Sequence, residues 1–160
     1  MSLAQTTIDT PSNISVRLGW AYPLDSDTRQ ITGNLIGVGF DYFLNRALIP
    51  GANGESYISA DWLGKSASGT KGNMFPVMLN QRWYSAPSMV GGDDGNRTYY
   101  FVGAGAYIMD VTNTKTVFGA RVGLGMELGE KLFAEANLSY TEAANFRRGS
   151  NIAIYIGYRF

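Results

Sequence analysis

Eight charged residues occupy alternate positions within the apolar stretches of this sequence, and they form a balanced set. Four are arginines and four are carboxylates: Arg17, Asp41, Asp61, Arg82, Arg121, Glu127, Glu135 and Arg159. Charges that leave water must pair, because an unpaired buried charge costs a great deal of free energy. The predicted chemistry is therefore ion pairing inside the folded chain. Two roles stay open: a salt-bridge network that fills the interior, or a polar gate that limits conduction.

The sequence lacks the residues on which most catalytic and metal sites depend. It contains no Cys and no His, which removes disulfides, thiolate zinc sites and histidine-assisted catalysis. The 13 basic residues equal the 13 acidic residues, so no basic excess is available for nucleic-acid binding. We therefore expect no catalytic residues, no metal site, no cofactor and no nucleic-acid partner.

The segments that carry these charges alternate apolar and polar residues with a period of two, which is typical of strands. Eight such segments follow one another: 13–22, 31–43, 56–64, 73–84, 98–109, 116–128, 132–141 and 151–160. No helical pattern separates them, so hairpin connections are expected. Segments of about ten residues match tilted strands that cross a bilayer. The prediction is an all-β fold, an eight-stranded antiparallel up-and-down transmembrane β-barrel over residues 13–160.

The composition of the two faces predicts which of them is inside. One face carries Val, Leu, Ile, Ala and aromatic residues, without a charge in any segment and with Gln81 as a polar exception. The other carries Gly, Ala, Ser, Tyr and the eight charges, which suits a narrow interior. Lipid tolerates the apolar face, where an Arg or Lys costs about 2–4 kcal/mol at the midplane. A soluble calycin-like barrel would instead turn its apolar face inward.

Aromatic residues on the apolar face gather toward the two ends of the strands. Two aromatic belts around an aliphatic zone indicate a membrane barrel, because Trp and Tyr prefer the interfaces. The belt on the side of the termini comprises Tyr42, Trp83, Tyr100, Tyr158 and Phe160. The opposite belt comprises Trp20, Tyr22, Trp62, Phe75, Phe118 and Tyr140.

Away from most of the charges, the inner face is rich in glycine and aromatic residues. One interpretation is a small apolar cavity that opens outward. The other is that aromatic rings fill the space against the glycines, with Tyr99, Phe101, Tyr107, Phe133 and Tyr155 as the rings. The second is preferred, since eight strands leave an interior only wide enough for side chains.

The last ten residues, Asn-Ile-Ala-Ile-Tyr-Ile-Gly-Tyr-Arg-Phe, end on Phe160, with Ile152, Ile154, Ile156 and Tyr158 at alternate positions before it. This pattern resembles the C-terminal signal of bacterial outer-membrane barrels. The glycine-rich segments 101–107 and 118–127 resemble the OmpA/OmpX-like superfamily of small barrels. The resemblance implies a Gram-negative outer membrane, a signal peptide already removed, and recognition of Ile154, Ile156, Tyr158 and Phe160 by the barrel-assembly machinery.

The resemblance also implies outer-membrane lipid as a partner. Arg147 and Arg148, in an expected outer loop, would meet the phosphates of lipopolysaccharide or stay solvated. In that superfamily the turns on the side of the termini are short. Here the connections at about 44–55 and 85–97 are as long as the outer ones or longer, which disfavours an adhesin. Residues 1–12 are expected to be a flexible tail, in which residues 1–3 read as an expression scar.

The sequence therefore predicts a monomeric, non-enzymatic integral outer-membrane barrel with a structural or interaction role. A salt-bridged polar network would occlude its interior. One alternative is a narrow channel for small solutes or hydrophobic molecules. A soluble calycin-like ligand-binding barrel is the alternative from another class, since a fold alone does not determine a function.

Overall fold

A computed structural model describes residues 12–44, 46–50, 54–65, 72–85, 97–111 and 113–160. Of the predicted tail, only Ser12 is among them, and the expression scar at 1–3 lies outside the described residues. The elements in chain order are β1 Ile14–Pro23, α1 Ser26–Thr32, β2 Leu35–Leu44, β3 Gly54–Lys65, β4 Asn73–Tyr84, β5 Thr98–Asp110, β6 Thr114–Leu128, β7 Leu132–Thr141, β8 Ala143–Ala144, β9 Arg147–Arg148 and β10 Asn151–Arg159.

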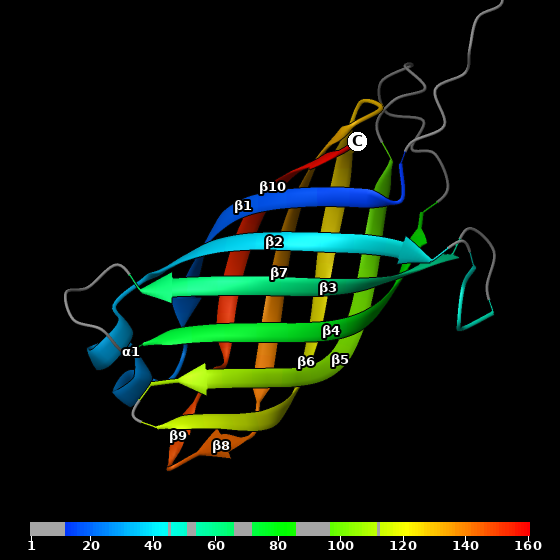
Figure 1. Cartoon of the computed structure of the whole chain (residues 1–160). Helices are drawn as coiled ribbons and strands as arrows, with labels where there is room; N and C mark the ends of the chain where they lie inside the picture. The colour runs from blue at the N-terminus through cyan, green and yellow to red at the C-terminus, as the bar shows by residue number, and fades with distance from the viewer. Residues whose placement is uncertain (1–11, 45, 51–53, 66–71, 86–96, 112) are drawn as a thin grey trace, which may run out of the picture.

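Within these residues, eight long strands close into an antiparallel barrel, which confirms the predicted architecture (Figure 1). Their order around the barrel is β1-β10-β7-β6-β5-β4-β3-β2, so each long strand pairs with its neighbours along the chain. The barrel closes where β1 pairs with β10, with Val16 opposite Tyr158. Ser12, the first described residue, lies beside the C-terminal strand there, since Arg159 Nε donates a hydrogen bond to the carbonyl oxygen of Ser12 at 3.1 Å.

The apolar face lies outside the barrel and the charged face lies inside. Leu18, Leu124 and Ile156 expose 63%, 68% and 64% of their surface, whereas Arg17 and Asp41 are buried. This is the reverse of a soluble ligand-binding barrel, which buries its apolar face. The residues predicted for the two aromatic belts also face outward, and all are exposed except Trp83, which is half-buried.

The expectation that no helix interrupts the strands is wrong. Helix α1 occupies Ser26–Thr32, and β2 begins at Leu35 rather than at residue 31. Asp25 caps the helix, because its Oδ2 accepts a hydrogen bond from the Thr28 N–H at 2.9 Å. Seven residues are too few to show a helical hydrophobic period, so the alternation suggested a strand. No helix in the described part of the chain is long and apolar enough to cross a membrane.

Helix α1 and the β8–β9 hairpin lie at the end of the barrel opposite the C-terminus (Figure 1). Thr28 Oγ1 joins them by donating to the carbonyl oxygen of Arg148 at 2.9 Å. Ile31 of α1 and Ala144 of β8 pack against the apolar cluster inside this half of the barrel. The helix and the hairpin therefore cover this end.

Candidate functional site

The interior next to α1 is filled by apolar side chains. These buried residues are Ala21, Leu35, Leu63, Met74, Met78, Tyr107, Met109, Val111, Ala153 and Tyr155. Aromatic rings lie directly over glycines of the neighbouring strands. A Cβ atom at Gly119 would lie 2.4 Å from the Tyr107 ring, and one at Gly37 would lie 2.7 Å from the Tyr155 ring. The predicted packing of rings against glycines is confirmed here, and Met74 and Met78 belong to the same buried cluster.

The middle of the barrel holds a cluster of charges around Arg17, whose side chain is fully buried. Its Nη2 lies 2.8 Å from Asp61 Oδ1 and 3.1 Å from Asp41 Oδ1. Its Nη1 lies 2.9 Å from Glu135 Oε2. Asp41 also accepts a hydrogen bond from Ser15 Oγ at 2.8 Å. One guanidinium from β1 therefore ties together carboxylates from β2, β3 and β7, across the full width of the barrel.

Arg121 of β6 completes this inner cluster from the opposite wall. Its Nη1 pairs with Asp61 Oδ2 at 3.1 Å, so Asp61 bridges two arginines. Its Nε donates to Asn80 Oδ1 at 2.7 Å, and its Nη2 donates to Ser59 Oγ at 2.7 Å. Arg121 thus shares the carboxylate of Asp61 with Arg17.

A second cluster, the rim cluster, closes the interior on the side of the termini. Arg82 Nη2 lies 2.6 Å from Glu55 Oε2, and Arg159 Nη2 lies 2.8 Å from Glu55 Oε1. Arg97 Nη2 pairs with Glu127 Oε2 at 2.8 Å. The guanidinium of Arg82 also lies 4.4 Å from the centre of the Phe43 ring. Three arginines and two carboxylates thus share the rim.

Two members of the rim cluster, Glu55 and Arg97, were not predicted. Each lies one residue beyond the strand bounds drawn from the sequence, in phase with the inward positions Tyr57 and Tyr99. Extending the alternation by that residue would have found both. The eight predicted charges themselves all reach one of the two clusters.

The two clusters form one electrostatic system. Among the described residues, the inner cluster has two arginines and three carboxylates, and the rim cluster has three arginines and two carboxylates. Tyr99 joins them, because its hydroxyl donates to Glu135 Oε1 at 2.8 Å while its ring lies 5.0 Å from the guanidinium of Arg82. The negative excess of one cluster is therefore balanced by the positive excess of the other.

The inner cluster offers ion pairing rather than metal binding. No group of three or more His, Cys, Asp or Glu side chains in the described part of the chain could hold a metal ion. The carboxylates of Asp41, Asp61 and Glu135 face arginines instead. The arrangement neutralises buried charge and links strands that are not neighbours in the sheet.

The remaining predicted residues lie on the outer surface. Ile152, Ile154, Ile156, Tyr158 and Phe160 all face outward on or next to β10 and are exposed. Arg148 lies on β9, where its guanidinium stacks over the Tyr140 ring at 5.1 Å.

No protein-family model and no curated protein matches this sequence. Solved structures do match its fold. The outer membrane enzyme PagL superposes with a TM-score of 0.60 at 13% identity, covering 92% of this chain and 97% of PagL. Ail of Yersinia pestis superposes with a TM-score of 0.55 at 13% sequence identity, covering 94% of this chain and 100% of Ail. The N-terminal β-barrel domain of Pseudomonas aeruginosa OprF superposes with a TM-score of 0.54 at 16% sequence identity, covering 94% of this chain and 100% of that domain.

One of these proteins is described as an enzyme and the other two are not. At 13–16% sequence identity, the likeness shows a shared fold and not a shared function. The superpositions extend over 94% of this chain and over the full length of the OprF domain and of Ail, so the likeness covers nearly the whole fold. The chain therefore has the fold of the small outer-membrane β-barrels of the OmpA/OmpX-like type.

Proposed function

We propose that this chain is a non-enzymatic integral barrel of a bacterial outer membrane, with its interior sealed by the inner and rim clusters. The observation that carries the proposal is the inversion of its two faces. The guanidinium of Arg17 is fully buried among three carboxylates, while Leu18 beside it exposes 63% of its surface. Such an outward band is stable in lipid, not in water.

The sealed interior supports a structural or interaction role over a channel. Buried ion pairs cross the barrel at the inner cluster, and apolar side chains fill the half next to α1. Opening a path would separate these buried ion pairs, which costs several kcal/mol for each ion left without its partner. The interior therefore acts as a brace that holds the strands in register.

An interaction role is supported by the β8–β9 hairpin. Phe146 at its tip exposes 97% of its surface. Its φ of 65° is a backbone conformation that residues other than glycine rarely adopt. Arg147 and Arg148 follow it directly. The strained, fully exposed Phe146 would contact a partner, and Arg147 and Arg148 beside it would bind acidic groups of that partner or the phosphates of a lipid headgroup.

The non-enzymatic assignment rests on the sequence, because PagL demonstrates that this fold can carry an enzyme. The chain contains no His and no Cys, so neither a histidine general base nor a thiolate nucleophile is available. We also propose that the exposed alternation ending on Phe160 is the signal for barrel assembly and that the barrel is a monomer in lipid.

Two measurements test this function. The purified chain should stay dispersed only with detergent and should migrate differently on gels before and after boiling; a soluble monomer without detergent would overturn the membrane location. In planar bilayers, the wild type and Arg82→Ala should give no large, stable conductance steps. Stable pores in the wild type would overturn the sealed interior while leaving the membrane location intact.

A further inference from the structure

A short segment after β2, residues 46–50, lies against the outer wall of the barrel on the side of the termini. The Leu48 N–H donates to Ser56 Oγ at 2.8 Å, and the Ile49 N–H lies 3.4 Å from Gln81 Oε1. Ser56 Oγ also donates to Gln81 Oε1. We name residues 46–50 the strap.

The strap explains the polar exception on the apolar face. Gln81 is outward in the alternation of β4, yet it exposes only 4% of its surface, and Ser56 of β3 exposes none. Backbone N–H groups in a lipid environment need partners within the protein. Gln81 and Ser56 supply them, so two outward polar side chains hold the strap where hydrocarbon would otherwise lie.

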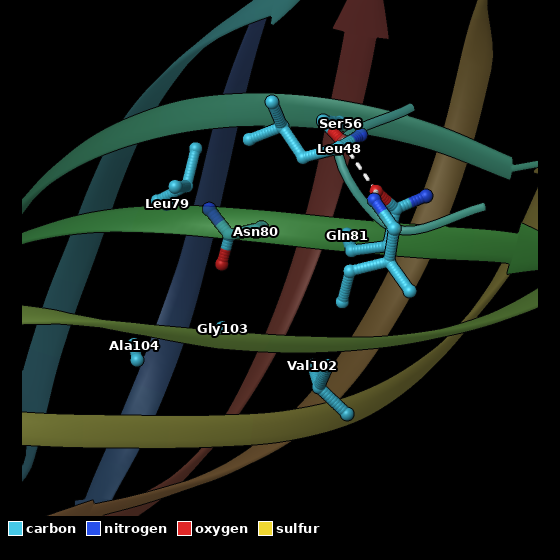
Figure 2. A pocket seen from close by; sticks show the side chains of 9 residues that line it. Leu48, Ser56, Leu79, Asn80, Gln81, Val102, Gly103 and Ala104 are labelled. Atoms are coloured by element: carbon cyan, nitrogen blue, oxygen red, sulfur yellow. Dashed lines mark hydrogen bonds between the residues drawn. The ribbon is translucent and has the colours of Figure 1, made fainter. Parts of the chain in front are cut away.

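An open groove runs between the strap and the outer wall of β4 and β5 (Figure 2). Its volume is about 250 Å³, and Leu48, Leu79, Val102 and Ala104 line it with aliphatic surface. Gly103, between the outward residues Val102 and Ala104, contributes backbone to the wall. The groove opens outward, away from the two interior clusters.

The register of β4 and β5 gives the depth of the groove. The aromatic pair Trp83 and Tyr100, whose ring centres lie 5.3 Å apart, occupies the neighbouring outward position toward the rim. Gln81 pairs with Val102, and Leu79 pairs with Ala104, successively farther from the rim. Because an aromatic belt marks the headgroup level, the groove begins where acyl chains begin.

We propose that this groove seats one acyl chain of a phospholipid from the leaflet on the side of the termini. The inference rests on the proposed membrane location. Leu79 and Val102 on its floor expose 46% and 41% and continue the outward apolar band, and the strap adds Leu48 and Ile49 as a second wall, 44% and 49% exposed. A chain bound between two walls contacts more apolar surface than one on the open barrel.

Native mass spectrometry of the full chain in detergent, with added phosphatidylglycerol, tests this site. The wild type should retain one lipid. Ala104→Phe fills the groove and should reduce the lipid-bound fraction at least tenfold. Ala136→Phe, an exposed outward alanine on β7, makes the same change far from the groove and should retain the lipid. Glycerol phosphate, which lacks acyl chains, should not compete.

The outcomes separate this proposal from the proposed function. Unboiled gel mobility reports whether each variant is folded, and insertion into phospholipid vesicles reports the membrane location independently. An inserted wild-type barrel that retains no lipid would overturn the groove alone. Equal lipid loss in the two alanine variants would overturn it too, as would a wild type that retains a second copy of the chain instead of lipid.

Discussion

Arg17 and Asp61 meet across a glycine. Arg17 Nη2 lies 2.8 Å from Asp61 Oδ1, although β2 separates their strands. In register, Arg17 lies opposite Gly39 and Gly39 lies opposite Asp61. A Cβ atom at Gly39 would lie 2.2 Å from Asp61 Oδ1 and 2.5 Å from Arg17 Nε. The missing side chain of Gly39 is the space in which this ion pair forms.

Gly39→Ala should therefore destabilise the barrel by about 1–3 kcal/mol, because the added methyl group overlaps the ion pair. Urea unfolding in phospholipid vesicles, followed by tryptophan fluorescence, measures the change. Gly149→Ala is the control, since its Cβ would approach nothing closer than the Met74 sulfur at 3.2 Å. Equal losses for the two variants would contradict the role of Gly39.

Arg17→Met removes the shared partner of Asp41, Asp61 and Glu135 and leaves their charges buried. We expect a loss of about 3–5 kcal/mol in the free energy of unfolding. Arg97→Met breaks the ion pair with Glu127, in which the arginine side chain is 52% exposed. This substitution should lower the free energy of unfolding by only about 0–1 kcal/mol. The same urea titration compares them. Similar losses would indicate that the inner cluster is not the brace of the barrel.

Gln81→Leu should release the strap, because the Ile49 N–H and Ser56 Oγ lose their shared acceptor. Arg46 lies within the strap and is exposed, so trypsin cleavage after Arg46 reports strap opening. Loss of one such hydrogen bond should raise the cleavage rate about tenfold. Gln30→Leu, the same change on the exposed face of α1, should leave the rate unchanged. An unchanged rate in Gln81→Leu would contradict the anchoring role.

Phe146→Gly should stabilise the β8–β9 hairpin by about 1 kcal/mol, because glycine adopts a positive φ without steric cost. Hydrogen exchange of the hairpin amides measures this gain. Arg147→Gly has no positive φ to relieve and should lose about 0.5–1 kcal/mol. A destabilised Phe146→Gly would show that Phe146 contributes to folding rather than to contact with a partner.

The cap of α1 should depend on pH. Burial pushes the pKa of Asp25 upward, but hydrogen bonds from Thr28 outweigh it and hold the pKa below its ordinary value of 3.8. The ionised Asp25 cap therefore contributes fully to folding stability above pH 3.8, and this contribution is lost as the pH falls through the lower pKa of the folded state.

The Thr28 amide chemical shift, followed by NMR from neutral to acid pH, should therefore titrate with a midpoint below 3.8. Asp25→Asn should abolish this transition, and the neighbouring variant Asp27→Asn should leave it in place. A midpoint at or above 3.8 would contradict the cap.

Much of this architecture follows from the sequence. A period of two determines strands and assigns each residue to one of two faces, because side chains alternate across a strand. From that rule alone Leu18 and Arg17 fall on opposite faces, and Trp83 and Tyr100 fall on the outward face. Local patterns suffice for these features because each depends only on neighbouring residues in the chain.

Only the tertiary structure determined which residues these side chains contact. Arg17 reaches Glu135 on β7 only because the barrel closes and brings opposite walls together. Gln81 is covered only because the strap lies against the outer wall. Helix α1 depends on a cap at Asp25 and on packing of Ile31 over the barrel end. Alternation determines which face a residue occupies, whereas register and closure determine what it meets there, because contacts across the barrel join residues distant in sequence.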